Sequence, residues 1–237
     1  MGGLHGTALN VNTITRSGLL KGLGGPVLLL VVGVIGFTLG VHAVPESARP
    51  GAVDIGFSQD MVMHHQQAVL MATLALDRAT PAVRGIARSI LTSQSQEMGM
   101  MRGWLQVWGA PLVAATSMAW MAQHKPATAT AHAGATQPSR PSPMPGMAST
   151  DELARLWRAR GPAFDVLFMQ LMTRHHEGGI LMARRAEQGA HLQYVRDAAR
   201  GMLFEQAQEI SMMSAQLHAI GAQPLPPLFH TDAAATH

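Results

Sequence analysis

Apolar residues and histidines recur at intervals of three and four along two parts of the chain, the spacing that aligns side chains on one face of an α-helix. One set runs through Phe57, Met61, His64, Ala68, Met71 and Ala75, and the other through Phe168, Met172, His175, Gly179, Met182 and Ala186. This pattern predicts four long helices, over residues 54–79, 81–108, 163–188 and 192–220.

Proline and glycine mark the expected ends of these helices. Pro81 follows Thr80 and suits the first turn of the second helix. A glycine suits the position just after a helix, and three stand there: Gly109, Gly189 and Gly221. A shorter helix is expected over residues 151–159, capped by Thr150 and ended by Gly161-Pro162.

The two apolar sets belong to an internal repeat. Asp54, Phe57, Met61, His64, His65 and Met71 recur 111 positions later, and Gln94, Glu97, Met101 and Leu105 recur 112 positions later. An internal repeat indicates a repeated structural unit, here a helical hairpin. Two hairpins can bury their apolar faces against each other, so we predict an all-α, four-helix bundle built from repeats 53–111 and 151–225.

The N-terminal region carries a membrane signal. Residues 1–21 include Arg16 and Lys21, and an uncharged, strongly apolar run follows over 22–44. About 20 apolar residues suffice to span a bilayer. With positive charge only before it, this run predicts a transmembrane helix or signal anchor with the C-terminal part outside the cytoplasm. The alternative is a signal peptide cleaved near Ala43, which leaves the same part outside.

Composition defines the remaining segments. Residues 45–52 are a short linker, 226–237 a tail, and 112–150 are rich in Ala, Thr, Pro, Ser and Gly, which predicts a flexible linker. The chain has 17 Met and no Cys, a combination suited to an oxidising compartment. The net charge of +3 comes without a Lys/Arg cluster, so nucleic acid is not an expected partner.

The repeated histidines and methionines are candidate metal ligands. Because each helical residue advances about 100°, Met61, His64, His65 and Met71 share one helix face, as do their counterparts. The candidate ligands are Met61, His64, His65, Met71, Met101, Met172, His175, His176, Met182 and Met213. Gln94, Glu97, Gln206 and Glu209 lie on the partner helices and are expected to orient ligating histidines from behind.

Copper is the metal that this donor set favours. Thioethers contribute little to zinc and suit Cu(I), and imidazole can also retain Cu(II). The sequence therefore favours a copper-binding protein rather than an enzyme, with a copper-transfer partner still open. Met118, Met121 and Met144 lie outside the repeats and are expected to be ordinary residues.

Two alternatives stay open. In the first, the bundle is structural or binds a protein partner, and its histidines are core residues bonded to Gln and Glu. In the second, the chain is a di-iron redox enzyme, a site that requires Glu-x-x-His motifs. No Glu-x-x-His sequence occurs in the chain, which argues against the second alternative.

The sequence also resembles a known family. FSQDMVMHHQQAVLMA with SQSQEMGMMRGWLQVWGAP, and FDVLFMQLMTRHHEGGILMA with EQAQEISMMSAQL, resemble the exported "domain of unknown function 305" proteins. The resemblance implies a ferritin-like helical bundle and, for some members, copper binding. The two halves differ in that Leu171 replaces Asp60 and Glu177 replaces Gln66. Gly178-Gly179 in the second half is expected to permit close helix approach.

Overall fold

The computed structural model describes residues 31, 49–124 and 144–228. The predicted N-terminal tail and membrane segment, and most of the C-terminal tail, therefore fall outside the described residues. Among the residues that are described, no helix is long and apolar enough to cross a membrane. The described residues from 49 onward belong to one compact unit.

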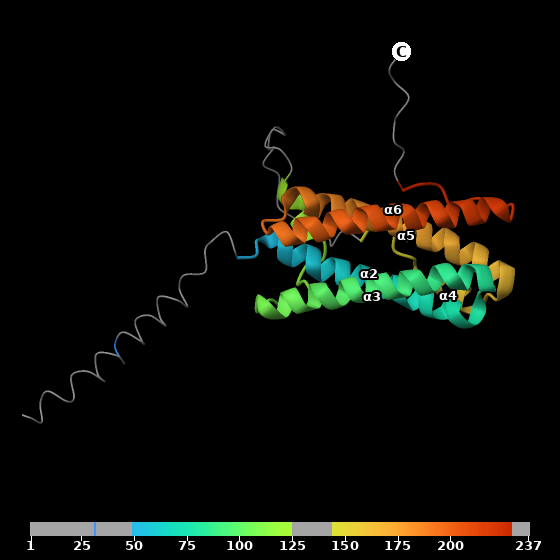
Figure 1. Cartoon of the computed structure of the whole chain (residues 1–237), viewed down its shortest axis with the longest axis horizontal. Helices are drawn as coiled ribbons and strands as arrows, with labels where there is room; N and C mark the ends of the chain where they lie inside the picture. The colour runs from blue at the N-terminus through green and yellow to red at the C-terminus, as the bar shows by residue number, and fades with distance from the viewer. Residues whose placement is uncertain (1–30, 32–48, 125–143, 229–237) are drawn as a thin grey trace, which may run out of the picture. The chain divides into compact units, whose positions relative to one another are not determined.

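The described part of this unit is helical and contains no strand, which confirms the predicted all-α class. Its helices are α2 (Ala52–Arg78), α3 (Pro81–Val107), the 3-10 helix η2 (Ala119–His124), α4 (Thr150–Arg158), α5 (Gly161–Gly189) and α6 (Gln193–Ala219) (Figure 1). The four long helices are those that the three-and-four spacing predicts, with ends that differ by at most two residues.

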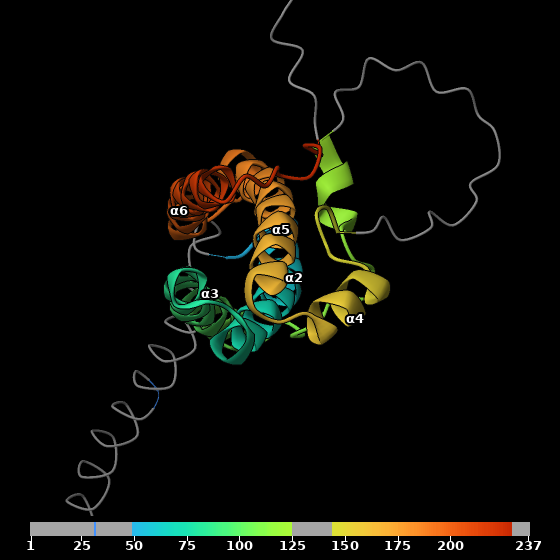
Figure 2. The ribbon, with the colours of Figure 1, turned by 90° about the vertical axis from the view of Figure 1, so that its right-hand side faces the viewer.

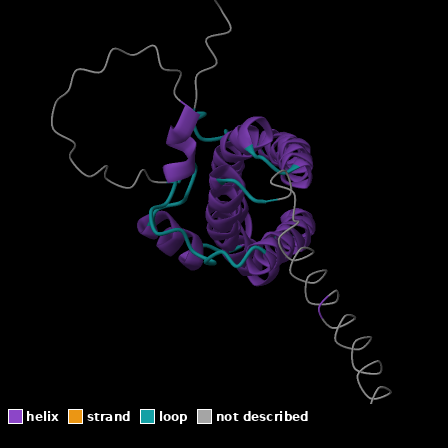
Figure 3. Cartoon of the chain, turned by 90° about the vertical axis from the view of Figure 1, so that its left-hand side faces the viewer, coloured by secondary structure: helices purple, strands orange, loops and turns teal. Residues whose placement is uncertain are grey.

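Helices α2 and α3 form one hairpin, α5 and α6 form the other, and the hairpins meet where α2 packs against α5. In Figure 2, α3 and α6 lie on one side of the α2–α5 pair, and α4 lies on the other. Figure 3 shows the same arrangement from the opposite end. The residues carried by α2 and α5 therefore form the centre of the unit, which explains why both helices are buried on more than one face.

Each hairpin fixes the turn of the other through a repeated aspartate. Asp54, at the start of α2, accepts hydrogen bonds from the backbone N–H groups of His191 and Leu192, at 3.0 and 2.9 Å, where α6 begins. Asp165, at the start of α5, accepts from the N–H and hydroxyl of Thr80, at 3.0 and 2.5 Å, where α3 begins. Both aspartates are buried, so these bonds satisfy donors that the helix ends leave free.

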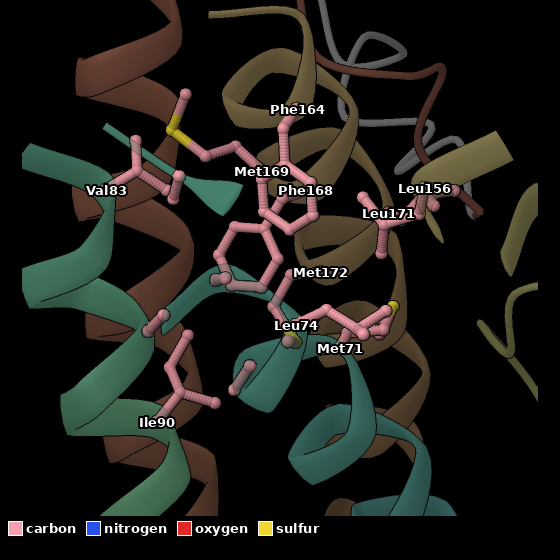
Figure 4. Close-up of a cluster of buried hydrophobic side chains, with 14 of the residues drawn as sticks. Met71, Leu74, Val83, Ile90, Leu156, Phe164, Phe168, Met169, Leu171 and Met172 are labelled. Atoms are coloured by element: carbon pink, nitrogen blue, oxygen red, sulfur yellow. The ribbon is translucent and has the colours of Figure 1, made fainter. Parts of the chain in front are cut away.

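The apolar core divides into two clusters along the α2–α5 pair. One lies towards the α4 end and contains Phe164, Phe168 and Leu171 of α5 together with Ile90 of α3 (Figure 4). The other lies towards the start of α2 and contains Phe57, Val195 and Trp120 among others. Leu171, which replaces Asp60, lies in the first cluster with Leu156 of α4, so its apolar side chain holds the short helix.

The segment 112–150 has more structure than its composition predicts. Residues 119–124 form η2, and Trp120 is buried against Phe57 at a ring-centroid distance of 5.8 Å. Asp60 accepts hydrogen bonds from Met118 N and Trp120 Nε1, at 2.7 and 2.9 Å. The expectation of a linker is therefore wrong for this part, because a buried carboxylate on α2 fixes it, and the middle, 125–143, lies outside the described residues.

Two details of the predicted helix ends also change. Ser149, rather than Thr150, caps α4, and it pairs with Glu152 in a capping box. Gly189 is the last residue of α5 rather than the residue after it. Gly109 and Gly221, with φ of 64° and 73°, follow their helices in the left-handed conformation that glycine favours, as predicted.

Candidate metal centre

Four histidines meet where α2 crosses α5. His64 and His65 of α2 and His175 and His176 of α5 are fully buried. The rings of His64 and His175, one from each repeat, lie with centroids 3.8 Å apart and planes tilted by 34°. The repeat thus places its two histidine pairs side by side at the centre of the bundle.

Backbone carbonyls orient the inner pair of histidines. His64 Nε2 lies 3.1 Å from the carbonyl oxygen of Pro145, and His175 Nε2 lies 3.0 Å from the carbonyl oxygen of His64. A carbonyl only accepts, so each Nε2 carries the proton and donates. In a neutral ring the remaining nitrogen, Nδ1, then holds an unprotonated lone pair.

Carboxylates on the flanking helices orient the outer pair. His65 Nε2 lies 2.7 Å from Glu97 Oε2 on α3, and His176 Nε2 lies 2.6 Å from Glu209 Oε2 on α6. These contacts are the ones expected of Glu97 and Glu209 from their place on the partner helices. A ligating histidine in a metal site commonly donates its other N–H to a carboxylate or carbonyl in this way.

Several buried polar atoms at this centre have no hydrogen-bond partner among the residues that the structure describes. They are the Nδ1 atoms of all four histidines and both side-chain polar atoms of Gln94 and Gln206. Leaving one such group unpaired costs about 1–3 kcal/mol, and most buried polar groups in native proteins are paired. The unpaired Nδ1 atoms are the donor atoms that a metal ion would use, so the residues present fit a bound metal.

Burial keeps His64, His65 and His175 in the neutral state that ligation requires. It lowers the pKa of His64 from 6.5 to about 3, with repulsion from His65 as the next cause. Burial also lowers the pKa of His65 to about 3, and it lowers that of His175 well below 6.5. Burial and the nearby Glu209 raise the pKa of Glu97 from 4.5 to about 7.

The six candidate methionines are fully buried, and they gather across the repeats rather than within each repeat. Met71 of α2 lies in one core cluster with Met172 of α5 and Met213 of α6 (Figure 4). Met61 lies in the other cluster with Met182 of α5 and Met101 of α3. Each cluster therefore draws its candidate methionines from both hairpins, because α2 and α5 lie side by side at the centre of the bundle.

A short strap from the second half of the linker covers the histidines. Residues 144–148 pass over α5, where Gly178 lies so close to Pro145 that a Cβ atom would overlap the Pro145 carbonyl. Gln67 of α2 fixes the strap by exchanging two hydrogen bonds with Ala148, at 3.0 and 2.7 Å. The sequence predicts that Gly178 permits close approach of another helix. In the structure, Gly178 instead permits close approach of the loop at Pro145.

The neighbouring Gly179 has a similar reason to lack a side chain. A Cβ atom there would overlap the amide of Gln206, which lies against α5 from α6. Within residues 49–124 and 144–228, no three His, Asp or Glu side chains are arranged to hold a single ion. Any metal bound here would therefore require donors of another kind or a rearrangement of these side chains.

Comparison with known proteins identifies the family. A family model described as Domain of unknown function (DUF305) matches residues 54–217, so the chain belongs to this family and the resemblance in its motifs is confirmed. The histidine centre, the strap and all but the outermost two residues at either end of the paired hairpins fall within the matched residues. Among curated proteins, none matches the sequence.

Solved structures agree with this assignment. A putative secreted DUF305 protein from Streptomyces coelicolor is 34% identical, with a TM-score of 0.64 over 75% of this chain and 98% of that one. A DUF305 fragment from Deinococcus radiodurans is 28% identical, with a TM-score of 0.57 over 72% and 99%. CopM in its Cu(II)-bound form is 25% identical, with a TM-score of 0.53 over 70% and 97%.

Proposed function

We propose that this protein binds copper outside the cytoplasm, through its buried histidines and methionines, and serves to sequester or hand on the metal. One observation carries the proposal: four buried imidazoles each donate from Nε2 to a fixed acceptor and leave Nδ1 unpaired. This is the state of a histidine ready to ligate, with its ring oriented and its second nitrogen unprotonated.

The same observation argues against a purely structural centre. A structural role predicts that the histidines, glutamines and glutamates satisfy one another. Glu97 and Glu209 do so, but within the described part of the chain the side chains of Gln94 and Gln206 have no partners, and neither do the four Nδ1 atoms. Because each unpaired group costs about 1–3 kcal/mol, a centre kept only for stability would be better built from apolar side chains.

The donors nearby favour copper over harder metals. On either side of the histidines lies a cluster with three candidate methionines. Thioethers suit Cu(I), and histidines suit both copper oxidation states. We propose that ligand sets mix imidazole with thioether, which agrees with the absence of a triad of His, Asp or Glu in the described residues. CopM, a relative of the chain, is known in a Cu(II)-bound form, which supports the same metal.

Location outside the cytoplasm forms part of the proposal. It rests on the apolar run 22–44, on the positive charges before it and on the absence of Cys from a chain with 17 Met. A protein exposed to oxidants can bind copper through thioethers without forming disulfides. The proposed partners are the metal ion, the membrane through residues 22–44 and a copper-transfer protein.

The test is a Cu(I) competition titration against a chromophoric chelator. We compare the natural chain with a variant in which His64, His65, His175 and His176 are all changed to Ala. A control variant changes the exposed His191 and His218 to Ala, so it loses imidazoles that lie away from the centre. High-affinity binding is expected in the natural chain and the control, and its loss in the four-histidine variant. Circular dichroism must show that the helices persist.

The methionines are tested separately with Met61→Leu and Met172→Leu. Leucine conserves most of the volume, so the exchange costs less than about 1.5 kcal/mol of stability. Both thioethers lie in clusters that flank the histidines, and their loss should weaken Cu(I) more than Cu(II). Full-stoichiometry Cu(I) binding by the four-histidine variant would refute the proposed centre. No binding by the natural chain would leave the structural interpretation.

A further inference from the structure

One end of the bundle exposes apolar side chains. Where α3 ends and the chain continues towards η2, Val107 is 85% exposed, Val113 61% and Leu112 45%. Tyr194, in the first turn of α6, is 44% exposed at the same end. Single exposed apolar residues are ordinary, but a group of them on adjoining elements marks an interaction surface. We call these four residues the apolar end.

Aromatic rings join the two hairpins at this end. Trp104 of α3 stacks on Trp108, the residue that follows this helix, at 6.1 Å between centroids, and the Trp104 ring lies 5.2 Å from that of Tyr194 of α6. Trp108 Nε1 donates a hydrogen bond to the Tyr194 hydroxyl at 3.0 Å. Tryptophan and tyrosine have an apolar body and a polar edge, which suits them to the boundary between water and lipid.

Charge distinguishes the two ends of the bundle. No Asp, Glu, Lys or Arg occurs between Arg102 and Lys125, so the whole described stretch over the apolar end is uncharged. At the opposite end, α4 alone carries Asp151, Glu152, Arg155 and Arg158 within nine residues. The far end is thus suited to water. At the near end, the uncharged segment 103–124 could approach an apolar phase without desolvating a charge, while Arg196 and Asp197 of α6 give this end a polar edge.

The chain enters the bundle at the apolar end. Gly51 precedes α2, and Asp54 joins this start to the beginning of α6 through His191 and Leu192. The apolar run that the sequence predicts to lie in a membrane ends at residue 44. Only residues 45–51 separate it from α2, and seven residues span at most about 25 Å.

We propose that the apolar end binds the surface of a phospholipid bilayer, to which residues 22–44 tether the bundle. A tether this short holds the end at high effective concentration near the lipid, so a weak contact suffices. The contact would leave α4 and the opposite end of the bundle facing away from the membrane. It is independent of copper, because the apolar end includes none of the candidate ligands.

The experiment uses the full chain in phosphatidylethanolamine–phosphatidylglycerol nanodiscs. Since the chain has no Cys, one introduced Cys carries one fluorescent label. Val107→Cys places the label on the apolar end, and Ile220→Cys places it at the C-terminus of α6, which lies at the opposite end and is 46% exposed. Lipids with nitroxide-bearing chains should quench the label at 107 and leave the label at 220 unaffected.

A second pair of variants tests the apolar side chains themselves. Val113→Cys carries the label alone or together with Val107→Asp and Leu112→Asp, whose exposed positions allow charge without disturbing the core. The two aspartates should abolish quenching at 113 while the chain stays in the disc. Equal quenching at 107 and 220, quenching at neither, or failure of the chain to enter the disc would each overturn the proposal. A label at 107 that is shielded from water without lipid quenching would overturn it too, and would indicate a protein partner.

Discussion

Gly178 is the position where the smallest change should disturb the histidine centre most. It lies inside α5, directly beneath the strap, and a Cβ atom there would overlap the carbonyl of Pro145. Gly178→Ala should therefore push the strap away from α5. The displaced carbonyl is the acceptor for His64 Nε2, which lies 3.1 Å away and is fully buried.

The size of the effect follows from the groups involved. Losing the acceptor leaves a buried imidazole N–H unpaired, at a cost of about 1–3 kcal/mol. Weakening the two bonds between Gln67 and Ala148 adds roughly 0.5–1.5 kcal/mol each. Against this, Ala in place of Gly within a helix stabilises by roughly 0.5–1 kcal/mol. With the middle of each range, the net expectation is a destabilisation of about 3 kcal/mol, which for a unit of this size lowers Tm by roughly 6–12 °C.

Gly99→Ala is the matched control. Gly99 is an exposed glycine inside α3, and a Cβ atom there meets nothing within 4 Å. Gly99→Ala should gain only the stabilisation that Ala gives within a helix, roughly 0.5–1 kcal/mol, and should unfold at a slightly higher temperature than the natural chain. Thermal unfolding followed by circular dichroism compares the three proteins. If Gly178→Ala proved as stable as Gly99→Ala, the strap would not pack on α5 as described, and its role in orienting His64 would be wrong.

Two further predictions concern the buried polar groups. Because the pKa of His64 is about 3 in the folded protein and 6.5 otherwise, the unfolded chain binds more protons between these values, and stability should fall as pH drops from 6.5 towards 3. At pH 5 His64 lowers the free energy of unfolding by about 2 kcal/mol. In urea denaturation at a series of pH values, His64→Gln should therefore reduce the loss of stability towards low pH, although Glu97 acts with the opposite sign between pH 4.5 and 7. An unchanged dependence of stability on pH would count against a buried neutral His64. Asp60→Leu, which copies the residue of the second repeat, should release Trp120 and shift its fluorescence to longer wavelength, whereas an unshifted spectrum would show that Asp60 does not hold η2.

The helices were predictable because their signals are local. Pro81 begins α3, Gly109 and Gly221 follow their helices, and the three-and-four spacing gives the buried faces. The contacts of Glu97 and Glu209 with the histidines were also predictable, since both glutamates interrupt an apolar stripe and require partners.

The rest depends on contacts between distant parts of the chain. Spacing along one helix cannot reveal that Met71 meets Met172, because this follows from how α2 crosses α5. The composition of 112–150 predicts a linker, and only the buried Asp60 and Gln67 on α2 show which parts of it pack. The sequence also did not show that Asp54 and Asp165 each bond to the turn of the other hairpin, although their repetition indicated a shared role.

Those two aspartates bear on how the fold could have arisen. Asp54 acts on the turn of the second hairpin and Asp165 on that of the first, so an isolated hairpin would lack the carboxylate that stabilises its own turn. Two separate copies of one hairpin, arranged as a symmetric dimer with the His64 and His175 rings side by side, would supply that carboxylate to each other. The single chain thus has the contacts expected of a homodimer of hairpins, and because both hairpins lie in one chain each half can differ from the other. Asp60 and Leu171, which occupy equivalent positions, illustrate such a difference. Asp60 in the first half accepts a hydrogen bond from Trp120 of η2, whereas Leu171 in the second half lies in one apolar cluster with Leu156 of α4.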